Sequence, residues 1–156
     1  MVELEVLGVV QAEEHHFPLV LLRHEARVLP ILVGLAEARA IQDGLLGEKM
    51  VRPMTHDLIC NLLAGLHAEL KSVTIYSLES DTFFAHLNVE QKDEEGRVRQ
   101  VLRIDSRPSD SIAIAVRVGC PVYAAEEVMD VAGQDASILA GDSDDEDDDE
   151  GGQFEA

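Results

Sequence analysis

A run of acidic residues near the end of the sequence limits what this chain can fold into. Residues 142–150 carry eight carboxylates in nine positions, and hydrophobic periodicity already stops at about residue 133. A segment of this composition buries too little apolar surface to offset the entropy lost on ordering. We therefore expect residues 133–156 to form a disordered acidic tail and residues 1–132 to form a single domain.

The net charge of −19 is distributed unevenly along the chain. Nine of the 31 acidic residues lie beyond residue 141, and residues 1–141 hold the other 22 against all 12 basic residues, which is a net charge of −10. This balance excludes a nucleic-acid partner held by overall attraction. A partner held by a local basic surface is still compatible with it.

Length and composition predict a soluble protein with one aliphatic core. The chain has 156 residues, of which 46% are hydrophobic and 4% aromatic, and it has no tryptophan. No apolar run is long enough to span a membrane, and the first residues lack the basic region of a signal peptide, so we expect a cytoplasmic protein. Cys60 and Cys120 lie far apart in apolar surroundings, and we expect both to be reduced.

Strands and helices are predicted in blocks rather than in strict alternation. This order favours an α+β fold, with a mixed or antiparallel sheet of about six to seven strands packed with three to four helices. The expected strands are 2–10, 18–22, 27–33, 73–78, 82–91, 97–105 and 122–124, and the expected helices are 35–46, 55–66, 108–118 and a turn at 126–131.

The second predicted helix carries one wide apolar stripe. Thr55 is its expected N-cap, because threonine accepts hydrogen bonds from the free amides of a first turn. Five aliphatic residues share one face and predict a helix of the core. They are Leu58, Ile59, Leu62, Leu63 and Leu66.

Common catalytic motifs are missing from the sequence. It contains no nucleophile elbow, phosphate-binding loop, dinucleotide fingerprint or Cys-x-x-Cys pair. His56 and His67 share a helix face but lie roughly 16 Å apart, so they cannot share a metal ion. Acyl transfer, dinucleotide chemistry and zinc binding therefore have no support in the sequence.

Acidic residues stand where strands end and helices begin. Asp105 ends a predicted strand, Asp57 and Asp110 lie in first turns of predicted helices, and Glu126 begins the last turn. Acids in a first turn are also favoured by the helix dipole, which gives each of these helix residues an ordinary structural reading. Carboxylates from several elements could otherwise meet around Mg²⁺ or Mn²⁺, with Glu37 as a further ligand.

One predicted strand is locally basic. Period-two alternation places Arg97, Arg99 and Arg103 on the same face, and Arg107 follows just beyond the strand. Guanidinium groups in this arrangement suit phosphate oxygens, although a solvated face that pairs with acids fits the pattern as well. If the acidic tail folded back on these arginines, deletion of residues 141–156 would raise nucleic-acid affinity at low salt.

Several stretches resemble the bifunctional nuclease domain family. The clearest is Arg107-Pro108-Ser109-Asp110 within residues 104–113, followed by Gly-Cys-Pro-Val-Tyr at 119–123 and Ala-Glu-Glu-Val at 125–128. Residues 28–34 and the Thr55-His56-Asp57-Leu58 segment agree in the same order. The resemblance covers about residues 2–132 and is closest to the short prokaryotic form.

The resemblance implies an α+β domain in a small homo-oligomer, a dimer or trimer, that degrades RNA and DNA. Chemistry then assigns the roles. Asp57, Asp105, Asp110 and Glu126 are the expected ligands of a divalent cation that activates water. His56 is the expected acid or base, Arg107 is expected to neutralise the phosphate, and Asp57 and Asp110 complete the catalytic set. Arg97, Arg99, Arg103 and Arg107 are expected to bind the nucleic-acid backbone.

The alternative is a non-catalytic nucleic-acid-binding or regulatory module. In that interpretation the Arg107 to Asp110 segment is only a junction between a strand and a helix. Pro108 presets the first helical turn, Ser109 or Asp110 caps it, and Arg107 bridges to a carboxylate. Convergence of Asp57, Asp105, Asp110 and Arg107 on one cleft would favour the nuclease, whereas dispersal would favour the module.

Overall fold

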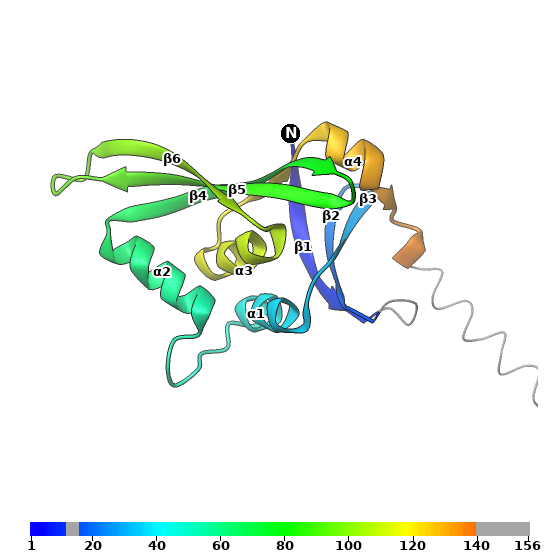
Figure 1. Ribbon diagram of the computed structural model, residues 1–156, viewed down its shortest axis with the longest axis horizontal. Helices are drawn as coiled ribbons and strands as arrows, with labels where there is room; N and C mark the ends of the chain where they lie inside the picture. The colour runs from blue at the N-terminus through cyan, green and yellow to red at the C-terminus, as the bar shows by residue number, and fades with distance from the viewer. Residues whose placement is uncertain (12–15, 140–156) are drawn as a thin grey trace, which may run out of the picture.

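Eight strands form one mixed sheet in the order β6-β5-β4-β7-β1-β2-β3-β8, in a computed structural model that describes residues 1–11 and 16–139 (Figure 1). All neighbouring strands are antiparallel except β4 and β7, which are parallel. The strands are β1 (Val2–Val10), β2 (Leu19–His24), β3 (Arg27–Leu32), β4 (Ala68–Glu79), β5 (Thr82–Lys92), β6 (Val98–Ser106), β7 (Val122–Ala124) and β8 (Gln134–Asp135).

Four helices accompany the sheet: α1 (Leu35–Leu46), α2 (Thr55–Gly65), α3 (Pro108–Val118) and α4 (Glu126–Ala132). In Figure 1, α1, α2 and α3 lie on one side of β4 to β6, and α4 lies at the other side near β3. The α+β prediction is thus confirmed, with one strand more than expected. The additional strand is β8, which lies beyond residue 132 and pairs with Arg27 and Val28 of β3. Residues 140–156, where most of the predicted tail falls, lie outside the described residues.

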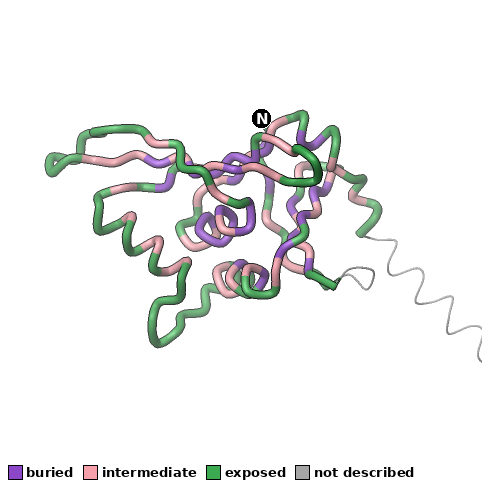
Figure 2. The backbone as a smooth tube through the Cα atoms, viewed as in Figure 1, coloured by how far each residue is buried: buried purple, intermediate pink, exposed green. Residues whose placement is uncertain are grey.

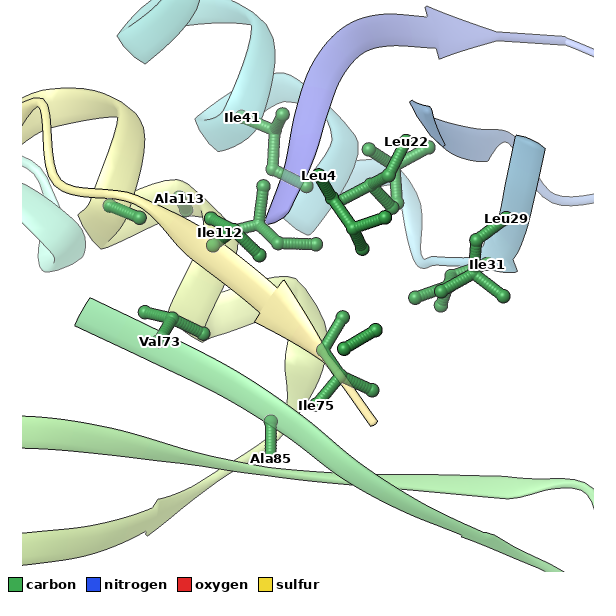
Figure 3. Close-up of a cluster of buried hydrophobic side chains, with 14 of the residues drawn as sticks. Leu4, Leu22, Leu29, Ile31, Ile41, Val73, Ile75, Ala85, Ile112 and Ala113 are labelled. Carbon is green, nitrogen blue, oxygen red and sulfur yellow. The ribbon is translucent and has the colours of Figure 1, made fainter. Parts of the chain in front are cut away.

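The core is aliphatic, as the composition predicts, and lies between the sheet and helices α1 and α3 (Figures 2 and 3). Ile41 of α1 and Ile112 of α3 are fully buried, as are Val73 and Ile75 of β4. Alternate residues of β5 face this core, because Ala85, Leu87 and Val89 are buried while the residues between them are not. The even-numbered residues of β5 therefore lie on the opposite face of the sheet.

Helix α2 corrects two predictions. Its N-cap is Met54 rather than Thr55, and the amide of Met54 donates to Asp57 Oδ2 at 2.9 Å. The predicted core stripe is only partly covered, because none of the helix residues is fully buried. Ile59 and Leu63 pack against the core, whereas Leu58, Leu62 and Leu66 are 49%, 55% and 59% exposed. We call these last three residues the α2 leucine stripe.

Membrane-spanning helices are not found in the described part of the chain, where no helix combines sufficient length with sufficient apolar character. Both cysteines are free, as predicted. Burial raises the pKa of the Cys60 thiol and raises that of Cys120 to about 11.

Candidate functional site

The first turns of α2 and α3 meet through two side chains. His56 Nε2 lies 2.9 Å from Asp110 Oδ1, a contact between residues 54 positions apart. Pro108 occupies the first turn of α3, where its fixed φ suits the helix and its missing N–H costs no hydrogen bond. Packing of α2 against α3 brings the two turns together.

Arg107 joins a third helix to this pair. Its Nε donates to Asp110 Oδ2 at 3.0 Å, and its Nη2 donates to Glu37 Oε1 at 3.2 Å. Glu37 lies in the first turn of α1. The glycine at residue 34 leaves room for the Glu37 carboxylate, which a β-carbon at that position would strike. We call His56, Asp110, Arg107 and Glu37 the His56 cluster.

The members of the His56 cluster differ in their access to solvent. The side chain of His56 is 12% exposed, that of Asp110 is 29% and that of Arg107 is 65%. Arg107 also lines a groove of about 390 Å³ with Gly34 and Phe83. The two carboxylates raise the pKa of Arg107, Asp110 more than Glu37, so its guanidinium stays charged. Arg107 is therefore the most accessible of these three side chains.

Asp57 lies next to His56 in sequence but has a different partner. Arg117 Nε donates to Asp57 Oδ1 at 2.8 Å, and Arg117 Nη1 donates to the backbone carbonyls of Ala40 and Ala113. These bonds connect α2 with α1 and α3. The hydrogen bond from Arg117, followed by that from Met54, lowers the pKa of Asp57. The side chain of Asp57 thus connects the helices.

The four expected metal ligands do not meet in the structure. Asp105 pairs across the sheet with His86, on the face opposite the core, because side chains alternate along β6. Glu126, on α4, forms an ion pair with Arg27 of β3 at 3.4 Å. Asp57 and Asp110 face different arginines.

A divalent cation therefore does not fit the predicted set of donors. In residues 1–11 and 16–139, no three His, Cys, Asp or Glu side chains are grouped so that they could hold a metal ion. Both carboxylate oxygens of Asp110 and both of Asp57 already accept hydrogen bonds from protein donors. We derive no chemical step through a cation from this arrangement.

The predicted basic residues are divided between two places. Arg107 belongs to the His56 cluster, and Arg97 forms ion pairs with Asp93 and Glu95 in the turn before β6. Arg103 pairs across the sheet with Asn88, on the face opposite α1, α2 and α3, and Arg99 lies at the register shift near the start of β6. Neither Arg99 nor Arg103 forms an ion pair with another described residue. The four arginines therefore do not form one continuous stripe.

Sequence reasoning missed Arg117 and the pairing of His56 with Asp110. One signal was available for Arg117. It is the only charged residue between Asp110 and Pro121, and it follows the apolar run 112–116 near the end of the predicted helix. A lone charge there needs a partner when the helix is buried. The partner of His56 could not be read from the sequence, because Asp57 lies beside it in the chain while Asp110 lies beside it in space.

Comparison with known proteins identifies the family. The model of the bifunctional nuclease domain matches residues 19–137. Two proteins of Mycobacterium tuberculosis, the uncharacterized protein MT1877 of strain CDC 1551 and the uncharacterized protein Rv1829 of strain H37Rv, are each 40% identical to the chain over 135 residues. Each match covers 85% of this chain and 77% of the relative. The chain therefore belongs to the bifunctional nuclease domain family, as the motifs around Asp57 and Asp110 predict.

Proposed function

We propose that the protein is a nuclease that hydrolyses phosphodiester bonds of RNA and DNA at the His56 cluster. The observation that carries the proposal is the hydrogen bond between His56 Nε2 and Asp110 Oδ1, with Arg107 on the second oxygen of the same carboxylate. A histidine oriented by a carboxylate and placed beside a guanidinium is an arrangement suited to proton transfer at a phosphate. Nucleic acid is proposed as the substrate because the chain belongs to the bifunctional nuclease domain family.

The role of His56 follows from its partner. An ionised carboxylate only accepts hydrogen bonds, so His56 Nε2 donates to Asp110 and the lone pair of the neutral ring lies on Nδ1. In the proposed reaction Nδ1 takes a proton from water as the water oxygen bonds to phosphorus. The bond from phosphorus to the leaving sugar oxygen breaks, that oxygen takes up a proton from solvent, and His56 returns its proton to solvent afterwards. Asp110 fixes the ring and stabilises its protonated form.

Arg107 would bind the phosphate. Its Nε and Nη2 are used by Asp110 and Glu37, whereas Nη1 has no partner among the described residues. Two N–H groups of Nη1 are therefore available for a phosphate oxygen, in the planar geometry that favours such contacts. The positive charge would stabilise the charge that develops on the phosphate oxygens during attack.

The alternative function is a nucleic-acid-binding or regulatory module without catalysis. Three observations favour it. Asp57 and Asp105 lie apart from Asp110 and Arg107, which is the dispersal expected of a module. Pro108 begins α3 as such a junction requires, and Arg107 bridges Asp110 and Glu37. One element of that reading is wrong, since Arg107 is the N-cap and neither Ser109 nor Asp110 caps α3. Activity measurements must separate the two functions.

A cleavage assay with matched variants tests the proposal. End-labelled single- and double-stranded RNA and DNA are incubated with the full chain in Mg²⁺, Mn²⁺ or EDTA. His56→Ala and Asp110→Asn are each expected to lower the cleavage rate by about 10²- to 10⁴-fold, with the circular dichroism spectrum unchanged. His16→Ala, which changes an exposed histidine outside the cluster, is the control.

Each arm of the assay decides one point. Equal rates for wild type and both cluster variants would overturn the proposed site and favour the module. Loss of all activity in EDTA would support the prediction that cleavage needs Mg²⁺ or Mn²⁺. The cation would then be bound by a set of ligands other than the predicted four. Activity that persists in EDTA supports proton transfer by His56 alone.

The predicted homo-oligomer also belongs to this proposal. The α2 leucine stripe exposes three large apolar side chains side by side, which is typical of an interaction surface. The exposed positions of α2 carry no charged residue, although 28% of the chain is charged. Two copies of an acidic protein can therefore meet there across a twofold axis without bringing like charges together. A cytoplasmic location remains a prediction.

A further inference from the structure

Aromatic residues are few in this chain, and three of the described ones, Tyr76, Phe84 and Tyr123, lie on one face of the sheet. The chain has two tyrosines and four phenylalanines, and no aromatic side chain is among the buried core residues of the described chain. Tyr76 of β4 lies near two rings of β5, with centroid distances of 5.0 Å to His86 and 6.3 Å to Phe84. We call Tyr76, Phe84 and His86 the aromatic platform.

The aromatic platform lies on the face opposite α3. Its β5 members occupy even-numbered positions, whereas Ala85 and Leu87 between and beyond them are buried in the core. Tyr123, the second tyrosine, is on the same face, because both it and His86 pair with Thr74. The platform is therefore separated by the sheet from the His56 cluster, which lies at the starts of α1, α2 and α3.

The rings of the aromatic platform are uncharged and partly accessible, since Tyr76 is exposed whereas Phe84 and His86 are half-buried. Tyr76 is 42% exposed, and its ring is inclined by 31° to that of His86. Burial, and next the charge of Arg103, lower the pKa of His86, while Asp105 opposes this. The imidazole is thus neutral at neutral pH, a form in which it presents a flat π surface without a hydration shell around a charge.

Two arginines border the aromatic platform on β6. Arg103 is near enough to His86 to affect its protonation, and Arg99 lies further along β6, at its register shift. Both side chains are exposed and neither is paired with a described acid, although Asp105 and Glu90 also lie on this face. The charge of the face is mixed, so contact with the platform must come mainly from stacking, with the arginines adding contacts to phosphates.

We propose that Tyr76, Phe84 and His86 form a stacking surface for the bases of a single-stranded nucleic acid, whose phosphates contact Arg99 and Arg103. Neighbouring rings on adjacent strands of an open sheet suit successive unpaired bases, whereas bases in a duplex are already stacked and paired. The inference does not depend on the proposed hydrolysis, because the aromatic platform and the His56 cluster lie on different faces. A nucleic acid bound here would be held on this face while the rest of its chain passes around the edge strand β6 to the His56 cluster.

Binding of labelled ten-nucleotide strands to the full chain tests the inference. Fluorescence polarisation is measured at low salt with dT and rU oligonucleotides and with a ten-base-pair duplex. Phe84→Leu and Tyr76→Leu keep an apolar side chain but remove the ring, and each is expected to weaken single-strand binding roughly 5- to 100-fold. Leu46→Ala is the control, because Leu46 is 64% exposed at the end of α1 and belongs neither to the aromatic platform nor to the groove beside Arg107.

Two further variants separate the possible results. Arg103→Gln is expected to reduce the slope of log affinity against log salt by about one. His56→Ala is expected to bind single strands like wild type even if it no longer cleaves them, so failure of the proposed hydrolysis would leave this inference standing. Equal effects of Leu46→Ala and Phe84→Leu would overturn the inference, as would a preference for the duplex. Loss of self-association in Tyr76→Leu without loss of binding would also overturn it and would make the platform an interface between copies.

Discussion

His56 Nε2 and Asp110 Oδ1 are 2.9 Å apart and connect the first turns of α2 and α3. The contact places one imidazole and one carboxylate at the junction of two helices, beside the guanidinium of Arg107. Neither residue needs the other for its local structure, since each helix begins without a side-chain cap from this pair. The contact therefore joins the two helices without capping either of them.

If His56 and Asp110 act as one unit, their substitutions will not add. We expect the double variant His56→Ala/Asp110→Asn to lose no more kcat/KM than His56→Ala alone, because Asp110 acts only through the ring that it orients. Steady-state cleavage of a single-stranded oligonucleotide measures this for the four proteins. Losses that multiply would mean that Asp110 has a role of its own.

Asp57 is expected to stabilise the fold rather than to take part in cleavage. Asp57→Asn removes the carboxylate that faces Arg117, whose side chain is 12% exposed, and should cost about 1–3 kcal/mol of unfolding free energy at pH 7. Asp43→Asn is the control, because its partner Arg39 is 74% exposed, and it should cost at most about 0.5 kcal/mol. Urea unfolding measures both.

The contribution of Asp57 has a defined pH dependence. Its folded-state pKa is lowered, so its stabilisation is complete above the unfolded pKa of about 3.9 and is lost as the pH falls through the folded value. The difference between wild type and Asp57→Asn should therefore shrink below about pH 4. A difference that stays constant down to pH 2 would contradict the role of the carboxylate charge.

Ser111 should be replaceable by alanine with a gain in stability. Its hydroxyl is fully buried in α3 and has no hydrogen-bond partner in the described structure. Ser111→Ala removes an unsatisfied polar group and improves helix propensity, which we expect to raise the unfolding free energy by about 1 kcal/mol. Ser72→Ala should have the opposite effect, because the Ser72 hydroxyl accepts a hydrogen bond from Asn88 at 2.9 Å. Thermal and urea unfolding compare the two, and destabilisation by Ser111→Ala would show that the hydroxyl has a partner.

The α2 leucine stripe should hold the copies of the protein together. We expect wild type to sediment as a dimer or trimer and Leu62→Glu to sediment as a monomer, because the substitution brings like charges to an apolar contact. Val131→Glu changes an exposed residue on α4, 75% exposed, and should leave the assembly intact. A monomeric wild type in sedimentation velocity would refute the prediction, and so would an oligomer that tolerates Leu62→Glu.

Cys120 should react slowly with thiol reagents. Burial raises its pKa to about 11, so at pH 8 the reactive thiolate is rare, and alkylation should be roughly 100-fold slower than for an exposed cysteine. Mass spectrometry after iodoacetamide treatment measures the rate in the native protein. Unfolding in urea should restore ordinary reactivity, and fast labelling before unfolding would contradict the buried position.

The pattern of apolar residues was sufficient to predict the fold class, and the motifs around Asp57 and Asp110 were sufficient to predict the family. Period-two and helical spacing define most strands and helices, and aliphatic composition defines the kind of core, because these properties depend on neighbours in the chain. Errors arose where the outcome depends on distant contacts. β4 begins at Ala68 rather than at residue 73, since Leu70 is buried opposite Val89 of β5.

Only the tertiary structure decided which predicted site residues meet. The sequence determined that Asp57, Asp105, Asp110 and Glu126 stand near the ends of elements, but their partners come from segments up to 99 residues away. Alternation along β6 turns Asp105 away from the helices, and packing of α2 on α3 gives Asp110 to His56 and Asp57 to Arg117. Local spacing fixes the side of an element on which a side chain lies, whereas the packing of whole elements fixes what that side chain touches.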